Sequence, residues 1–214
     1  MGQMTHKNEY LIIIAISLYF TYFHHFCPMH HPEDNPWQIT SEQVAYDNPW
    51  INVTEYQVID PSGNPGIYGK VHFKNIAIGV FPLDDELNTY LVGQFRFALG
   101  QYSWEMPEGG GPVGTDPLES AKRELLEETG LKATKWTEIQ RLHLSNSVSD
   151  ELSILYLAQN LQQFEAEPED TEQLIVKKLP FNEVYQMVCE GTITDAMTIV
   201  AVLKVQVMIL EGHL

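Results

Sequence analysis

Three glutamates on one short segment are the residues of this chain best placed to do chemistry. Glu124 and Glu128 are four residues apart, and Glu127 lies three residues after Glu124. In a helix, side chains at these spacings stand about 5–6 Å apart on one face, where like charges cost about 0.2–0.5 kcal/mol per pair. A hard divalent cation, which prefers carboxylate oxygens, would offset that repulsion. A solvated acidic helix face is the alternative.

The segment that carries these glutamates has helix signals at both ends. Asp116 can cap a helix, Pro117 suits its first turn, and Gly130 suits the position after its last turn. We therefore predict a helix over 117–129, in which Arg123 can pair with a neighbouring carboxylate and fix its orientation. Its buried stripe would consist of Leu118, Ala121, Leu125 and Leu126.

A glycine-rich segment, Trp104–Gly114 (WEMPEGGGPVG), leads into this helix. Glycine lets a backbone approach a phosphate or a metal closely, because it carries no Cβ. A main-chain carbonyl in this segment would then be a further metal ligand.

The net charge of −17 limits the partners. A surface so negative repels phosphate backbones, so we expect no nucleic acid partner. It would also repel a small phosphorylated substrate, unless a bound cation reverses the field locally. A site for such a substrate should therefore contain a metal.

Two features bear on the compartment. The two cysteines, Cys27 and Cys189, form no CxxC pair and are interpreted as free thiols in a reducing, cytoplasmic environment. The apolar run Tyr10–Phe23 is shorter than the ~20 residues that span a bilayer. It has three interpretations: an upstream extension of the reading frame, which we favour, a weak membrane anchor, or an added packing element.

The rest of the chain alternates strand and helix patterns that suggest a mixed sheet between helices. A hairpin is predicted from two strands joined by a Pro- and Gly-rich turn, and five further strands and two closing helices follow. The predicted strands are 51–59, 68–73, 75–83, 89–97, 103–106, 152–158 and 174–179, and the closing helices are 182–190 and 195–209.

The glycine-rich segment and the helix together resemble the Nudix box, G-x5-E-x7-R-E-U-x-E-E-x-G-U, where U is a bulky aliphatic residue. The first Glu of the box is replaced here by Thr115, and we expect activity to survive because the later cluster carries the metal in this family. The matching residues are Gly109, Arg123, Glu124, Leu125, Glu127, Glu128, Gly130 and Leu131.

The resemblance extends from about Trp37 to the C-terminus and is closest to the branch of ADP-ribose pyrophosphatases and nucleoside diphosphate sugar hydrolases. It implies an α/β/α sandwich with a mixed sheet, an N-terminal antiparallel β extension and a homodimer. The implied division is an extension over 1–35, a β-hairpin region for dimerisation or substrate over 36–74, and the Nudix hydrolase domain over 75–214.

The resemblance also implies roles for individual residues. Glu124 and Glu128 would ligate Mg²⁺ or Mn²⁺, with Glu127 in support and the carbonyl of Glu108 as a further ligand. Arg123 belongs to the same catalytic motif. The implied substrate contacts are an arginine on the diphosphate, an acid facing the substrate and two aromatic residues stacked on the base: Arg96, Glu105, Trp50 and Tyr68.

Two questions stay open at this point. The general base that accepts a proton from water is either Glu151 or Glu172. The substrate is either ADP-ribose or another nucleoside diphosphate sugar, because the proline usual in ADP-ribose hydrolases about fifteen residues past the box is missing. A Nudix-like domain that senses a nucleotide without cutting it is the alternative function, and Thr115 is its only support.

Overall fold

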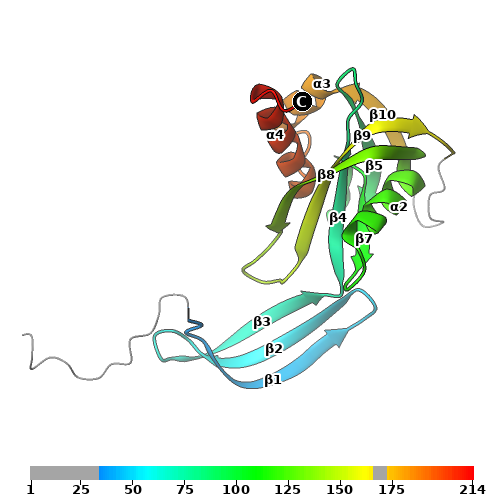
Figure 1. Cartoon of the computed structure of the whole chain (residues 1–214). Helices are drawn as coiled ribbons and strands as arrows, with labels where there is room; N and C mark the ends of the chain where they lie inside the picture. Colours follow the sequence, from blue (N-terminus) through cyan, green and yellow to red (C-terminus); the bar gives the residue numbers. More distant parts are fainter. Residues whose placement is uncertain (1–33, 166–172) are drawn as a thin grey trace, which may run out of the picture.

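The computed structural model describes residues 34–165 and 173–214. Figure 1 shows a three-stranded sheet beside a larger body of strands and helices. The elements are β1 (Gln38–Asp47), β2 (Ile51–Ile59), β3 (Pro65–Phe73), β4 (Asn75–Pro82), β5 (Asn88–Arg96), β6 (Gln101–Glu105), β7 (Glu108–Pro112), α2 (Pro117–Thr129), β8 (Leu131–His143), β9 (Leu152–Gln163), β10 (Ile175–Pro180), α3 (Phe181–Cys189) and α4 (Ala196–Leu210).

The central sheet is mixed and has the strand order β7-β4-β9-β8. β4 and β9 run parallel, while β4–β7 and β8–β9 pair antiparallel. Side chains alternate across a strand, so each face of β4 receives every second residue. Ile78 and Val80 pack in the cluster that contains Ala121 of α2, whereas Phe81 packs in the other cluster. The predicted α/β/α sandwich is thus confirmed.

The face opposite α2 is covered by α3 and α4 (Figure 1). Phe181 and Val184 of α3 and Ala201 and Val205 of α4 are buried there against strand residues such as Leu155. Full burial of a large apolar side chain stabilises a fold by about 1.5–3 kcal/mol. This layer therefore fixes where α4 begins, which matters for the site below.

A smaller sheet has the order β10-β5-β6, with both pairs antiparallel. Arg96 is the last residue of β5 and Glu105 the last residue of β6. The segment after β6 runs directly into β7, so this sheet delivers both residues to the edge of the central sheet.

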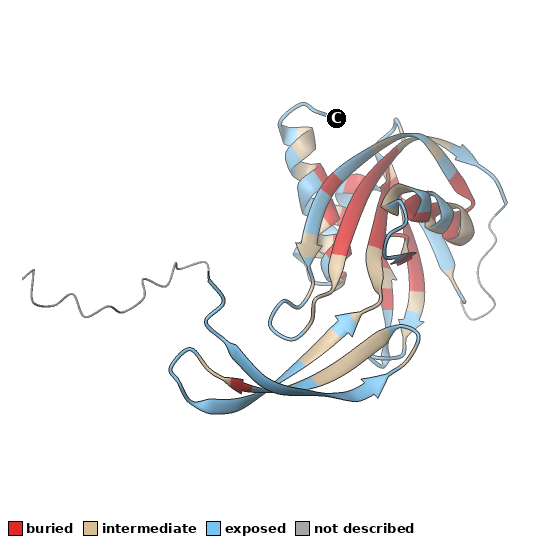
Figure 2. Cartoon of the chain, turned by 60° about the horizontal axis from the view of Figure 1, so that its bottom comes forward, coloured by how far each residue is buried: buried red, intermediate tan, exposed pale blue. Residues whose placement is uncertain are grey.

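The N-terminal sheet has the order β1-β2-β3 and is antiparallel throughout, which confirms the predicted N-terminal β extension. All ten residues of β1 are exposed in the single chain (Figure 2). The exposed side chains on and beside this sheet include several large apolar ones, namely Trp37, Ile39, Val44, Tyr46, Trp50, Ile67 and Tyr68.

Most predicted elements are present, and α2 has the predicted bounds. Three strands had no prediction, each for a local reason. β1 buries no side chain and so has no alternating pattern, β7 is built mostly of glycine, and β8 is largely exposed. β3 also begins earlier than predicted and β9 continues further.

Two further predictions concern the apolar run near the N-terminus and the two cysteines. The run Tyr10–Phe23 and Cys27 lie outside the described residues, while Cys189 is an exposed free thiol. Within 34–165 and 173–214, none of the helices combines the length and apolarity needed to cross a membrane.

Candidate active site

Helix α2 holds its glutamates in a fixed position because both its ends are well defined. The Asp116 side chain accepts a hydrogen bond from Leu118 N at 3.0 Å, and Gly130 adopts the left-handed conformation with φ 70°. The Leu125 side chain is fully buried against the central sheet, and Glu128 is only 3% exposed. The carboxylates of Glu124 and Glu128 therefore face the start of β7 and not bulk solvent.

Two contacts join α2 to β7. A Glu128 carboxylate oxygen accepts a hydrogen bond from Glu108 N at 3.0 Å. Gly109 lies so close to Glu124 that a Cβ there would stand 2.2 Å from the Glu124 carboxyl carbon. A side chain at this point would displace the Glu124 carboxylate from its position, which gives a reason for the first glycine of the predicted box.

Arg123 fixes the same cluster from the other side. Its guanidinium donates to the carbonyl of Gly110 at 2.8 Å and to a carboxylate oxygen of Glu124. It also pairs with Glu127 at 3.3 Å. The predicted pairing of Arg123 with a carboxylate is therefore present, and it orients two of the three clustered glutamates, Glu124 and Glu127.

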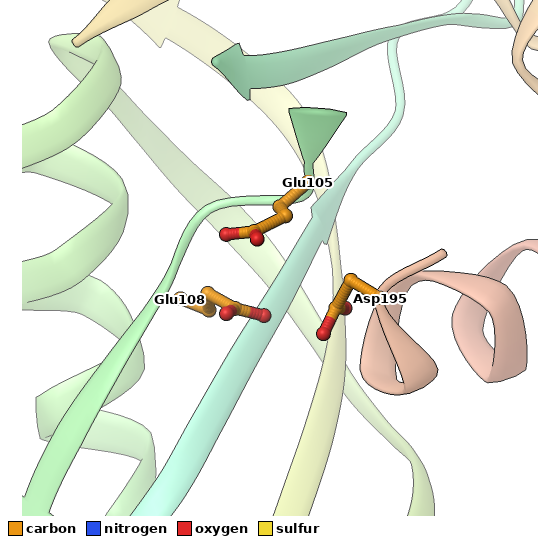
Figure 3. Close-up of side chains that lie close together, drawn as sticks. All are labelled: Glu105, Glu108 and Asp195. Carbon is orange, nitrogen blue, oxygen red and sulfur yellow. The ribbon is translucent and has the colours of Figure 1, made fainter. Parts of the chain in front are cut away.

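A second acidic group lies where β6 leads into β7. Ligand atoms of Glu105, Glu108 and Asp195 all lie within 4.8 Å of one another. Figure 3 shows them converging from β6, β7 and the start of α4. Asp195 caps α4 by accepting from Thr198 N at 2.7 Å, and Thr198 Oγ1 accepts from Met106 N at 2.9 Å.

Arg96 partly neutralises this group. It donates through Nε and Nη2 to Glu105, at 2.5–3.1 Å, and through Nη2 to Glu108 at 2.6 Å. Burial alone would lower the pKa of Arg96, but the two carboxylates outweigh burial and raise that pKa. The side chain therefore stays a cation at every working pH.

Glu108 has the most perturbed environment of the three acids. Burial, together with the negative charges of Asp195 and Glu105, raises its pKa well above the usual value, against the lowering effect of Arg96. Its Oε2 atom is buried and has no hydrogen-bond partner among the described residues. A buried carboxylate oxygen without a partner is costly, so this oxygen favours a cation or a proton beside it.

A cavity of about 330 Å³ opens beside these groups. Burial raises the pKa of Glu151, which lies in its wall. Trp50 also lines the cavity and is 66% exposed, so its ring is available for stacking. The full lining is Trp50, Phe73, Asn75, Ile76, Ala77, Arg96, Glu108, Gly109, Gly110, Leu144, Glu151, Asp195 and Met197.

The residues with a predicted role that do not line this cavity include the α2 cluster and Glu105, described above, and Tyr68. Tyr68 lines a different hollow, on the N-terminal sheet, where its ring makes an edge contact with Trp37 at 5.4 Å between centroids. Within one chain, Trp50 and Tyr68 therefore line separate cavities. Glu172, the alternative base, lies outside the described residues.

Asp195 is the site residue that sequence reasoning missed. It is the first residue of the predicted helix 195–209, and an acid at a helix start is typical of a cap. That cap exists, but the second carboxylate partner, Glu108, is far away in the sequence and no spacing rule connects the two. Only the packing of α4 on the sheet brings them together (Figure 3).

Comparison with known proteins agrees with this geometry. The NUDIX domain family matches residues 73–192, and the nucleoside diphosphate sugar hydrolase N-terminal domain family matches residues 37–71. The fold resembles a solved structure described as an ADP compounds hydrolase, with a TM-score of 0.74 at 20% identity, over 83% of this chain and 95% of that one.

Two curated relatives are ADP-ribose pyrophosphatases. The one from Mycobacterium tuberculosis is 34% identical over 60% of this chain and 64% of its own length. The one from Bacillus subtilis is 32% identical over 61% of this chain and 71% of its own length. The alignment thus spans about two thirds of each relative. The chain belongs to the Nudix family of pyrophosphohydrolases, with a nucleoside diphosphate sugar hydrolase N-terminal domain ahead of its Nudix domain.

Proposed function

We propose that this protein hydrolyses the diphosphate bond of a nucleoside diphosphate sugar such as ADP-ribose, giving a nucleoside monophosphate and a sugar phosphate. One observation carries the proposal. The carboxylates of α2 are held against Glu108–Gly110, at the wall of a cavity that also contains Arg96 and Glu151. Anion-binding and proton-accepting groups thus face a single space beside a potential metal site.

The residues present fit a hard divalent cation, Mg²⁺ or Mn²⁺. Glu124 and Glu128 would hold it, with Glu127 in support and the Glu108 carbonyl as a further ligand. Oxygen-only donors of this kind suit Mg²⁺, and the Glu108 side chain supplies a buried oxygen without a partner. When bound, such an ion neutralises diphosphate charge and lowers the pKa of water. The group Glu105, Glu108 and Asp195 adds negative charge on the same side.

The other residues of the cavity would bind the substrate and move the proton. Arg96 Nη1 makes no hydrogen bond to the described residues and would donate to a phosphate oxygen, while Glu105 holds the guanidinium in place. Trp50 would stack on the base. Glu151 would accept a proton as water attacks one phosphorus and the bond from that phosphorus to the bridging oxygen breaks.

We also propose that the working form is a homodimer. The exposed apolar side chains of the β1–β3 sheet, Tyr68 among them, would be covered by a second copy of the chain. Apolar patches of this kind on a soluble protein favour an interface. Sedimentation equilibrium should give twice the chain mass, and a single-chain mass at micromolar concentration would disprove the dimer.

A substrate panel tests the function. The purified chain is incubated with Mg²⁺ or Mn²⁺ and with ADP-ribose, ADP-glucose, UDP-glucose or GDP-mannose, and the products are identified by mass spectrometry. We expect a monophosphate pair from at least one substrate and no products when EDTA replaces the metal. If a nucleotide binds but is not cleaved with either metal, the sensor function is supported instead. The loss of cleavage would then be assigned to Thr115, which replaces the first Glu of the box.

A further inference from the structure

The segment 144–151, which brings Glu151 to the cavity, contains little regular structure of its own. Within it, Ser145 O accepts hydrogen bonds from the backbone N–H groups of Val148 and Ser149 at 3.1 and 2.9 Å. The segment connects the end of β8 to the start of β9, and Glu151 is its last residue before β9. Glu151 must point reproducibly at the cavity if it acts as a base. The contacts that fix this segment are therefore of functional interest.

One of these contacts comes from the end of β8, where His143 Nδ1 lies 3.1 Å from the Glu151 carbonyl oxygen. Further contacts come from β3 of the N-terminal sheet. Val71 N donates to Val148 O at 2.8 Å, and Asp150 N donates to Val71 O at 3.2 Å. The Tyr68 hydroxyl donates to Ser147 O at 2.6 Å. Both the N–H and the carbonyl of Val71 thus bind the backbone of segment 144–151, although β3 and this segment lie far apart in the sequence.

The Asp150 carboxylate adds the side-chain part of this connection. Its Oδ2 lies 2.8 Å from both Lys70 Nζ and His72 Nδ1, and its Oδ1 accepts from Phe73 N at 3.0 Å. Burial would raise the pKa of Asp150, but these partners outweigh it and lower that pKa to about 2. One ionised carboxylate, on the residue directly before Glu151, thus contacts three residues of β3.

We propose that Asp150 is a positioning residue: by binding Lys70, His72 and Phe73 N of β3, it holds Glu151 in its orientation at the cavity wall. The inference rests on the proposed function, in which Glu151 is the base. It assigns the N-terminal sheet a part in the chemical step of its own chain, in addition to any part in dimerisation.

The test compares Asp150→Ala with Asp47→Ala. Asp47 belongs to the same sheet and forms a similar carboxylate–lysine pair, with Lys74 at 2.7 Å, so it is a matched control. A displacement of about 1 Å in a reacting group can cost about 100-fold in rate. We expect Asp150→Ala to lower kcat about 10- to 100-fold with KM within about twofold, and Asp47→Ala to leave both unchanged.

Two further measurements separate positioning from general stability. Hydrogen exchange at Val71 and Asp150 should rise in Asp150→Ala while the core of α2 and β9 stays protected. In a Glu151→Gln background, Asp150→Ala should cause almost no additional loss of kcat. Asp150→Asn, which keeps the acceptor for Phe73 N, replaces the alanine variant if that variant does not fold.

The outcomes are distinguishable. Near-normal kcat in Asp150→Ala, or a full additional loss in the Glu151→Gln background, overturns the positioning role. A wild-type protein that cleaves no substrate of the panel overturns the proposed function and the positioning role with it. In that case hydrogen exchange still shows whether Asp150 anchors the segment.

Discussion

Glu128→Gln should reduce turnover by about 100- to 1000-fold, the range found when one electrostatic contact to a developing oxyanion is lost. The substitution removes a negative charge from the proposed metal site on α2. The Gln side-chain oxygen can still accept the hydrogen bond from Glu108 N, which is 3.0 Å long in the wild type. The melting temperature should therefore change little, and kcat on the preferred substrate together with a thermal melt would check both parts.

Glu119→Gln is the matched control for that variant. Glu119 lies on the same helix, is 67% exposed in its side chain and pairs with Lys122 at 2.6 Å, away from the cavity wall. Its substitution should leave kcat and the melting temperature within experimental error. Near-normal turnover in Glu128→Gln would disprove the proposed metal site on α2.

Glu151→Gln should lower kcat by about 100- to 10,000-fold, the usual contribution of a general base. A base works in its deprotonated form, and burial raises the pKa of Glu151 above its ordinary value of 4.5. For the wild type, kcat/KM should rise with pH through that raised pKa and level off above it. The Gln variant has no group to deprotonate, so its residual activity should lack this rise. A pH series of kcat/KM on both proteins measures the difference.

The competing base gives this prediction a sharp alternative. If Glu172→Gln removes the rise with pH and Glu151→Gln keeps it, the base is Glu172 and Glu151 has no proton to transfer. Glu138→Gln serves as the neutral control, because Glu138 is on β8 and its carboxylate pairs with Arg141 at 2.6–2.8 Å.

The parts of the fold that were predictable are those with strong local signals. Helix α2 has an N-cap at Asp116, a proline after it and Gly130 at its end, so both bounds could be inferred. β4 shows a long apolar run because both its faces are covered. By contrast, β7 contributes mainly backbone hydrogen bonds to β4, and a glycine run carries no side-chain pattern from which to infer them.

The candidate site divides in the same way. The cluster on α2 follows one helical spacing, and its residues were named from that spacing and from the family motif. The Glu105, Glu108 and Asp195 group depends on where α4 packs, which in turn depends on side chains such as Met197 and Val205 in the core. Contacts between elements so distant in the chain have no signature in a single sequence.

The bond between β3 and the segment before β9 has a consequence for protein engineering. The boundary between the two family matches, near residue 72, resembles a natural point for exchanging modules. Yet β3 and the Glu151 segment are joined by a backbone bridge at Val71 and Ser149. A chimera made at that boundary would combine a β3 strand from one protein with a 144–151 segment from another, and the contacts between them would not match. Segment 144–151 must therefore be transplanted together with the N-terminal sheet.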